Sequence, residues 1–142
     1  MTGRVTVTGG CHCGAVRFAA DVAAVNEVHD CNCSICAKSG FLHLFVPHGD
    51  FRLLSDPGAM STYRFGTGAA AHLFCATCGI KSFYQPRSHP DAWSVNYRAL
   101  DDGHPLTATI VAFEGRDWER GHAALTDHAD ETARKKAARQ AD

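Results

Sequence analysis

The amino-acid sequence predicts a mainly β fold, an all-β sandwich or barrel-like domain, and several observations support this prediction. Short segments rich in β-branched and aromatic residues recur along most of the chain. Turn-forming residues separate them at short intervals, for example Asp56-Pro57-Gly58, His89-Pro90-Asp91 and Asp101-Asp102-Gly103. The 142 residues suit one domain with a single hydrophobic core, and they lack the alternation of strands and long helices that marks a parallel α/β fold.

Nine segments are expected to form strands. In chain order they are 4–8 (RVTVT), 15–20 (AVRFAA), 41–47 (FLHLFVP), 51–55 (FRLLS), 61–65 (STYRF), 70–74 (AAHLF), 80–86 (IKSFYQP), 92–97 (AWSVNY) and 107–113 (TATIVAF). Within 80–86, we expect Ile80, Phe83 and Tyr84 to pack, with Phe83 and Tyr84 divided between the core and a pocket wall.

Two further segments are expected to be helical. Residues 34–39 are predicted to form a single turn, and residues from about 117 to 139 are rich in Ala, Glu, Lys and Arg. The last part of the second segment is polar on nearly every side, and an isolated helix of that length is only marginally stable in water. We therefore predict one folded domain over residues 1–125 and a polar, helical or disordered C-terminal tail over residues 126–142.

The composition excludes several classes of partner. Hydrophobic residues make up 45% of the chain and charged residues 20%, as in ordinary soluble proteins. The net charge of −1 argues against nucleic acid or an acidic membrane surface as a partner. No apolar run is long enough for a membrane span, and the N-terminal residues contain no apolar signal segment. We therefore expect a cytoplasmic protein, in which clustered cysteines stay reduced and bind metal or act in catalysis.

All seven cysteines fall in short clusters, Cys11-x-Cys13, Cys31-x-Cys33-x-x-Cys36 and Cys75-x-x-Cys78. Because the number of cysteines is odd, disulfides cannot pair all of them. A thioredoxin-like redox site would need a βαβ context, which this sequence does not predict. Such spacings let one chain reversal point its sulfur atoms at a shared metal ion, as zinc sites require. Because a closed tetrahedral zinc site takes four ligands, seven thiolates divide into four and three.

Two partitions of the sulfur atoms are compatible with these spacings. A structural zinc site of Cys11, Cys13, Cys75 and Cys78 keeps every cluster intact and leaves the triad Cys31, Cys33 and Cys36. A site of Cys33, Cys36, Cys75 and Cys78 separates Cys31 from its neighbours, so the first partition is preferred. The triad then either keeps an open coordination position or takes an eighth ligand from the histidines His12, His29, His43 and His72. The spacing alone leaves both alternatives open.

An open site with three thiolate ligands favours a particular chemistry. Three sulfur atoms donate charge to zinc, which makes it a weaker activator of water than in a three-histidine site. A substrate thiol suits the fourth position, because ligation deprotonates the thiol and leaves its sulfur reactive. We therefore expect two zinc ions per chain and, at the open one, formation or cleavage of a carbon–sulfur bond on a small-molecule thiol.

The three cysteine motifs resemble those of a known family. GGCHCGAVRF, CNCSIC and HLFCATCGIKSFYQPRS, with the connecting segments FRLL, TYRF, LDDG and FEGRDWE, are similar to the glutathione-dependent formaldehyde-activating enzyme family, and within it to the zinc-binding domain of centromere protein V. The resemblance runs from about Gly9 to about Glu119 and implies a β-tent, in which zinc joins two mainly antiparallel sheets.

The same resemblance assigns roles to the cysteines. It implies that a structural zinc ion is bound by Cys11, Cys13, Cys75 and Cys78, and a catalytic zinc ion by Cys31, Cys33 and Cys36. It further implies a carbon–sulfur lyase type of reaction, in which glutathione is joined to formaldehyde as S-hydroxymethylglutathione. Two other functions stay open: a thiol- or protein-binding module without turnover, and a structural domain in which both metal sites are closed.

Polar residues near the triad are candidate ligands for an anionic substrate. Lys38 and Ser39 follow Cys36, and Lys38 could bind a thiolate or a substrate carboxylate. Arg87, in the loop sequence QPRSHP, could pair with a carboxylate of a glutathione-like ligand through two hydrogen bonds. A solvated lysine and a structural salt bridge are the simpler interpretations of these two cations.

His29 and Asp30 precede Cys31 and are candidates for orienting the metal ligands, although His29 lies in a strand-like stretch and could equally face solvent. Trp93 and Trp118 are expected to be packing residues.

Overall fold

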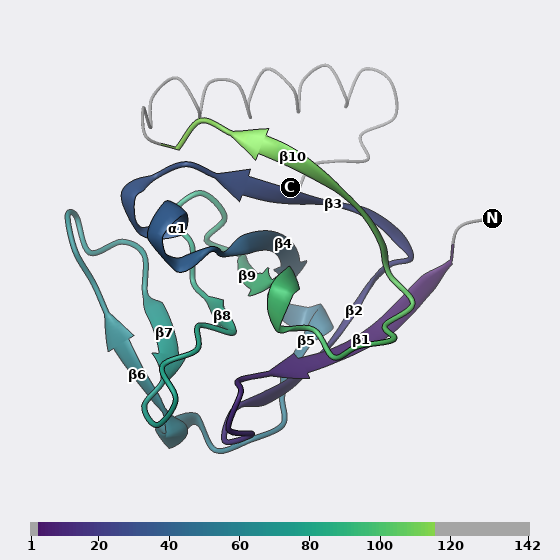
Figure 1. The fold of residues 1–142 in the computed structure, drawn as a ribbon, viewed down its shortest axis with the longest axis horizontal. Helices are drawn as coiled ribbons and strands as arrows, with labels where there is room; N and C mark the ends of the chain where they lie inside the picture. The colour runs from purple at the N-terminus through teal and green to yellow at the C-terminus, as the bar shows by residue number, and fades with distance from the viewer. Residues whose placement is uncertain (1–2, 116–142) are drawn as a thin grey trace.

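The computed structural model describes residues 3–115. Within this range the chain forms ten strands and one short α-helix, which confirms the mainly β prediction (Figure 1). The strands are β1 (Arg4–Gly10), β2 (Arg17–Ala23), β3 (Val25–Cys31), β4 (Leu42–Pro47), β5 (Phe51–Leu53), β6 (Met60–Tyr63), β7 (His72–Cys75), β8 (Phe83–Tyr84), β9 (Ala92–Asn96) and β10 (Thr107–Phe113). The helix α1 (Ser34–Ser39) covers the predicted helical residues, and short 3₁₀ turns span His48–Asp50, Pro57–Ala59 and Tyr97–Ala99.

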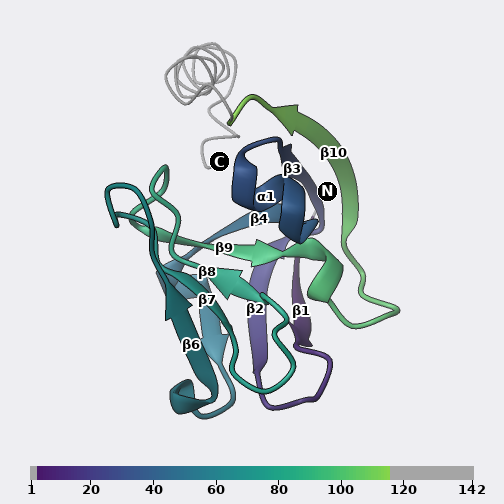
Figure 2. The same ribbon diagram turned by 60° about the vertical axis from the view of Figure 1, so that its left-hand side comes forward.

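The strands form three sheets (Figure 2). One contains β1, β2 and β5, the second contains β10, β3, β4, β9 and β8 in that order, and the third contains β6 and β7. The expected mainly antiparallel arrangement is present, but β10 runs parallel to β3, from the pair Thr107–Val25 to the pair Phe113–Cys31. This parallel pair and the separate two-stranded sheet were not predicted from the sequence. The parallel register brings the end of β10 beside Cys31.

Side chains from the three-stranded and five-stranded sheets form one hydrophobic core. Phe18 of β2 is fully buried, and its ring centre lies 6.2 Å from that of Phe83 in β8 and 5.6 Å from that of Phe51 in β5. Burial of one large apolar side chain of this kind stabilises the folded chain by about 1.5–3 kcal/mol. Trp93 packs against Phe83, with ring centres 5.2 Å apart, as expected for a packing residue.

The opposite face of the five-stranded sheet is more polar. Along β4, the side chains of Leu42, Leu44 and Val46 belong to the core, whereas His43 and Phe45 line a cavity. Successive side chains of a strand point to opposite faces, so this alternation follows directly from the strand geometry. The same rule divides Phe83, in the core, from Tyr84, on the cavity wall, as the sequence predicted.

Two strand predictions differ from the structure. β3 is not among the nine predicted strands, although the stretch around His29 is strand-like in sequence, and the structure places it as an inner strand between β4 and β10. Conversely, only Phe83–Tyr84 of the predicted strand 80–86 pairs as β8. The preceding residues are held by Asn96 instead, whose Nδ2 donates to the Lys81 carbonyl at 3.0 Å.

The expected tail (residues 126–142), the predicted helix (117–139) and Trp118 lie outside the described residues. Within residues 3–115, no helix has the length and the apolar composition needed to cross a bilayer.

Candidate metal centres and active site

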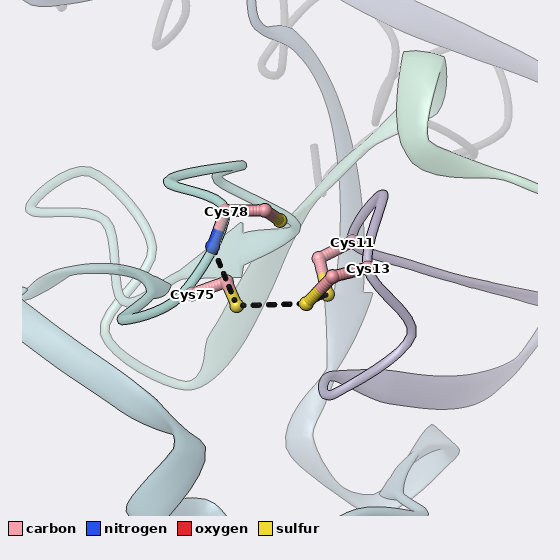
Figure 3. A group of neighbouring side chains, drawn as sticks. All are labelled: Cys11, Cys13, Cys75 and Cys78. Atoms are coloured by element: carbon pink, nitrogen blue, oxygen red, sulfur yellow. Dashed lines mark hydrogen bonds between the residues drawn. The ribbon is translucent and has the colours of Figure 1, made fainter.

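Four cysteines from two chain reversals come together as the first sulfur group (Figure 3). Cys11 and Cys13 lie in the loop between β1 and β2, Cys75 is the last residue of β7, and Cys78 lies in the turn that follows. The four sulfur atoms lie within 4.8 Å of one another, with 3.6 Å between Cys11 and Cys13 and 3.6 Å between Cys13 and Cys75. Gly79 continues the second reversal with a φ of 80°, a left-handed conformation that glycine adopts without strain.

The first sulfur group fits a tetrahedral zinc ion. Four sulfur atoms at the usual Zn–S length of about 2.3 Å lie about 3.8 Å apart. The backbone N–H of Val16 donates to Cys11 Sγ at 3.2 Å, and those of Thr77 and Cys78 donate to Cys75 Sγ at 3.4 Å. The bond from Cys78 is the main cause that lowers the pKa of Cys75 and thereby favours the thiolate that a metal ion requires.

Cys31, Cys33 and Cys36 form the second sulfur group. Cys31 ends β3, Cys33 caps the N-terminus of α1 and Cys36 lies within α1, which brings their three sulfur atoms within 4.8 Å of one another. Hydrogen bonds from Cys31 and Cys36 hold the pKa of Cys33 well below its usual range, whereas the same crowding raises the pKa of Cys36. A bound cation is therefore needed for all three thiols to ionise together, and this donor set fits zinc.

Within residues 3–115, no histidine or carboxylate completes the second sulfur group as a fourth ligand. His43 Nε2 lies 3.2 Å from Cys36 Sγ, but the imidazole does not come within 4.8 Å of all three sulfur atoms. The other ring nitrogen, Nδ1, lies 2.8 Å from Ser94 Oγ and 3.3 Å from Tyr84 Oη. Hydrogen bonds thus engage both nitrogen atoms of this buried ring.

None of the remaining candidate histidines has a ring nitrogen within 4.8 Å of all three sulfur atoms. His12 is exposed, and His72 contacts Lys81 through Nδ1 at 2.7 Å. His29 is 4% exposed and its ring centre lies 5.5 Å from that of Phe45, so the interpretation in which it faces solvent is wrong. Val28 and His29 are neighbours on β3, so their side chains point to opposite faces of the sheet, and both are buried. These positions favour the open three-sulfur site over a second closed site.

A cavity of about 820 Å³ lies against the second sulfur group. Its volume is in the range of small-molecule sites, about 300–1,000 Å³. Lys38 and Arg87, the two candidate anion ligands, both line the cavity and are exposed. Much of the remaining wall is aromatic, including Phe45, Phe65 and Phe113. Ser39 and Asp30 are exposed and do not line it.

The segment after β10 covers one side of the three sulfur atoms, and sequence reasoning missed it. Asn32 Nδ2 donates to Glu114 Oε1 at 3.0 Å, and the Gly115 N–H donates to Asn32 Oδ1 at 2.9 Å. At Gly115, a Cβ atom would overlap Cys31 Sγ and approach Cys33 Cβ at 3.2 Å. The glycine after the last predicted strand is the sequence signal that could have indicated this close approach.

Lys81 and His72 form a polar pair beside the cavity. The sequence did not predict this pair, because a single lysine in a predicted strand belongs to no recognisable motif. Lys81 Nζ lies 3.9 Å from the ring centre of Tyr84 and 4.9 Å from that of Phe41. The imidazole of His72 stacks on Phe65 and on Tyr84, with ring centres at 5.3 and 4.7 Å. Burial lowers the pKa of Lys81 to about 8, and burial together with the charge of Lys81 lowers the pKa of His72 to about 4.

Comparisons with known proteins agree with this architecture. A family model described as glutathione-dependent formaldehyde-activating enzyme matches residues 6–116, which contain all seven cysteines. The crystal structure of a Rhodobacter sphaeroides protein is similar to this one with a TM-score of 0.61 and 32% sequence identity, over 72% of this chain and 99% of that chain.

Proposed function

Since the chain belongs to the glutathione-dependent formaldehyde-activating enzyme family, we propose that it forms or cleaves the carbon–sulfur bond of a small thiol adduct such as S-hydroxymethylglutathione. The proposed reaction site is the group of Cys31, Cys33 and Cys36. The observation that carries this proposal is that three sulfur atoms meet at a cavity wall without a fourth protein ligand among residues 3–115.

The three thiolates suit a metal that accepts a substrate thiol. A zinc ion held by them would bind the thiol at its remaining position and lower the pKa of that thiol. His43 supports the site from behind: when Ser94 Oγ donates to Nδ1, the Nε2–H of His43 donates to Cys36 Sγ. Such a bond orients the sulfur ligand and reduces the charge that it donates to the metal.

The cavity wall supports a substrate that is partly anionic. Lys38 and Arg87 supply positive charge to it, and both groups suit the carboxylates of a glutathione-like molecule. The aromatic wall formed by Phe45 and Phe113 excludes water from the adduct. For the four-sulfur group, we propose a structural zinc ion, because its ligands come from the chain reversals of two different sheets, the loop between β1 and β2 and the end of β7.

Cobalt substitution with a glutathione titration tests the proposal. Two cobalt(II) ions should bind per chain, one in each sulfur group. Glutathione should then shift the sulfur-to-cobalt charge-transfer band, because its thiolate adds a sulfur ligand at one ion. S-methylglutathione, which has no free thiol, should leave the band unchanged. An unchanged band with glutathione itself would contradict an open thiol site and favour a structural domain.

Turnover requires a separate measurement. Exchange NMR on the zinc-loaded protein, with glutathione and formaldehyde at equilibrium with their adduct, should show faster exchange than the same mixture without protein. A shifted cobalt band without faster exchange would favour a thiol-binding module over an enzyme.

A further inference from the structure

Lys81 is a partly buried cation whose balancing charge comes from the second sulfur group. Among residues 3–115, its ammonium forms no ion pair with an aspartate or glutamate. The charges that favour its protonated form are those of Cys36, Cys33 and Cys31. Three thiolates and one divalent ion carry a net negative charge, which an ammonium complements. The rings of Tyr84 and Phe41 stabilise the same cation through cation–π contacts.

The contact with Lys81 determines where His72 carries its proton. An ammonium group has donors and no acceptor, so the bond of 2.7 Å requires His72 Nδ1 to accept. A neutral imidazole that accepts at Nδ1 carries its proton on Nε2. Phe65 and Tyr84 both stack on the ring of this 5%-exposed side chain, which lines the cavity, and Lys81 occupies the Nδ1 edge, so we infer that the Nε2 edge faces the cavity.

We propose that Lys81 and His72 form a proton relay that delivers a proton to the oxygen atom of the substrate adduct. This inference rests on the proposed function, because it assigns that oxygen to a thiol–aldehyde adduct. His72 is the catalytic residue in the relay, since its Nε2–H contacts the substrate oxygen. Lys81 acts through His72 and is a positioning residue that also supplies the proton.

The proton balance of the step is complete. The thiolate sulfur of the substrate attacks the carbonyl carbon of the aldehyde, the carbon–sulfur bond forms, and the π electron pair moves to oxygen. The oxygen takes the Nε2 proton of His72, and Nδ1 takes a proton from Lys81, so the imidazole ends neutral. A proton from water, which replaces the one that the thiol released on binding, then adds to His72 Nε2, and Nδ1 returns its proton to Lys81, so that the ammonium and the Nε2–H tautomer are both restored. Cleavage follows the same steps in reverse.

Lys81 is suited to this role by its surroundings. Burial lowers its pKa to about 8, so it releases a proton more readily than an ordinary lysine and is still protonated at neutral pH. The alkoxide that develops in the reaction is a much stronger base than the lysine amine.

NMR tests the geometry on the zinc-loaded full chain. Long-range ¹H–¹⁵N spectra at pH 7 should show His72 as a neutral ring with its proton on Nε2. Lys81→Met should abolish this preference, whereas Lys81→Arg should retain it because arginine also offers a cationic donor. A proton on Nδ1 of His72 in the unmodified protein would overturn the relay.

Exchange NMR with glutathione and formaldehyde tests the chemistry. His72→Phe keeps a ring to stack on Phe65 and Tyr84 but removes the proton path, so turnover should fall about 100-fold. Lys81→Arg should show a similar loss although the tautomer is preserved, because arginine does not release its proton. In both variants, glutathione should still shift the cobalt band. His104→Phe, a matched change beside Tyr97 and outside the cavity lining, should leave turnover unchanged.

The outcomes separate the relay from the proposed function. If the unmodified protein accelerates exchange and either His72→Phe or Lys81→Arg exchanges equally fast, the relay is wrong and the proposed function stands. If the unmodified protein does not accelerate exchange, both are wrong. Thermal melting of each variant identifies a folding defect, and where His72→Phe does not fold, Lys81→Arg decides.

Discussion

The sulfur atom of Cys13 lies 3.6 Å from that of Cys75, although the two residues are 62 positions apart in the chain. Cys13 belongs to the loop between β1 and β2, whereas Cys75 ends β7, in a sheet that shares no strand pair with theirs. A metal ion bound by this group would therefore join two separate sheets. The group of Cys31, Cys33 and Cys36 spans a single strand end and one helical turn, so a metal ion bound there would connect much less of the fold.

Cys13→Ser is expected to destabilise the protein more than Cys33→Ser. Loss of a metal that joins two sheets should lower the free energy of unfolding by more than about 4 kcal/mol, a size reserved for defects of this kind. Cys33→Ser should cost about 0.5–3 kcal/mol, the ordinary range for a point mutation. Urea denaturation with zinc analysis checks this, and each variant should lose one zinc ion. Equal destabilisation would show that both metals are structural.

Gly115→Ala should empty the second metal site while the first stays filled. The added Cβ would overlap Cys31 Sγ, and the chain there is held in place because the Gly115 N–H donates to Asn32 Oδ1 and Asn32 Nδ2 donates to Glu114 Oε1. We expect zinc content to fall from two ions to one per chain, with loss of the cobalt response to glutathione. Gly49→Ala is the matched control, because a Cβ at Gly49 meets no atom within 4 Å. Full zinc content in Gly115→Ala would contradict the close approach.

Ser94 and Tyr84 should act as alternative hydrogen-bond donors to His43. Ser94→Ala alone should cost about 1 kcal/mol, because Tyr84 Oη still lies 3.3 Å from His43 Nδ1. Adding Tyr84→Phe leaves this buried nitrogen without a donor and should lower the free energy of unfolding by a further amount of about 1–3 kcal/mol. Denaturation of the two single variants and the double variant measures the coupling between Ser94 and Tyr84. Purely additive losses of stability would contradict their role as alternative donors to His43.

The same double variant should change the metal site. When Nδ1 has no donor, His43 no longer has a fixed proton on Nε2 to offer to Cys36 Sγ. The charge-transfer band of the cobalt protein should therefore shift in Ser94→Ala/Tyr84→Phe without any added thiol. An unchanged band would show that the contact between His43 and Cys36 does not affect the metal.

Lys38→Met and Arg87→Met should weaken the binding of charged thiols selectively. Both cations are exposed, so each should contribute at most about 1 kcal/mol, or about a fivefold rise in the Kd for glutathione. Cobalt titration with 2-mercaptoethanol, which has no carboxylate, is the matched control and should give an unchanged Kd. Equal weakening of both thiols would show that these residues support the fold of the cavity rather than bind the substrate.

Much of the fold could be predicted because its signals are local. The helical turn at residues 34–39 follows from the spacing of Cys33 and Cys36 and ends at Gly40, which has a φ of 69°. The different environments of Phe83 and Tyr84 follow from the two-residue period of a strand. The stretch around Val28 and His29 is strand-like in sequence, but its position as an inner strand, with both side chains buried, depends on the pairing of β3 with β4 and β10.

The sequence by itself determined the family, the mainly β architecture and the cysteine clusters, because each depends on residues close together in the chain. Only the tertiary structure decided which distant groups meet. The parallel pairing of β10 with β3 places Gly115 against Cys31, and Lys81, in the segment before β8, reaches His72 of β7. Contacts of this kind depend on strand register and sheet packing, which the residue pattern of a single segment does not specify.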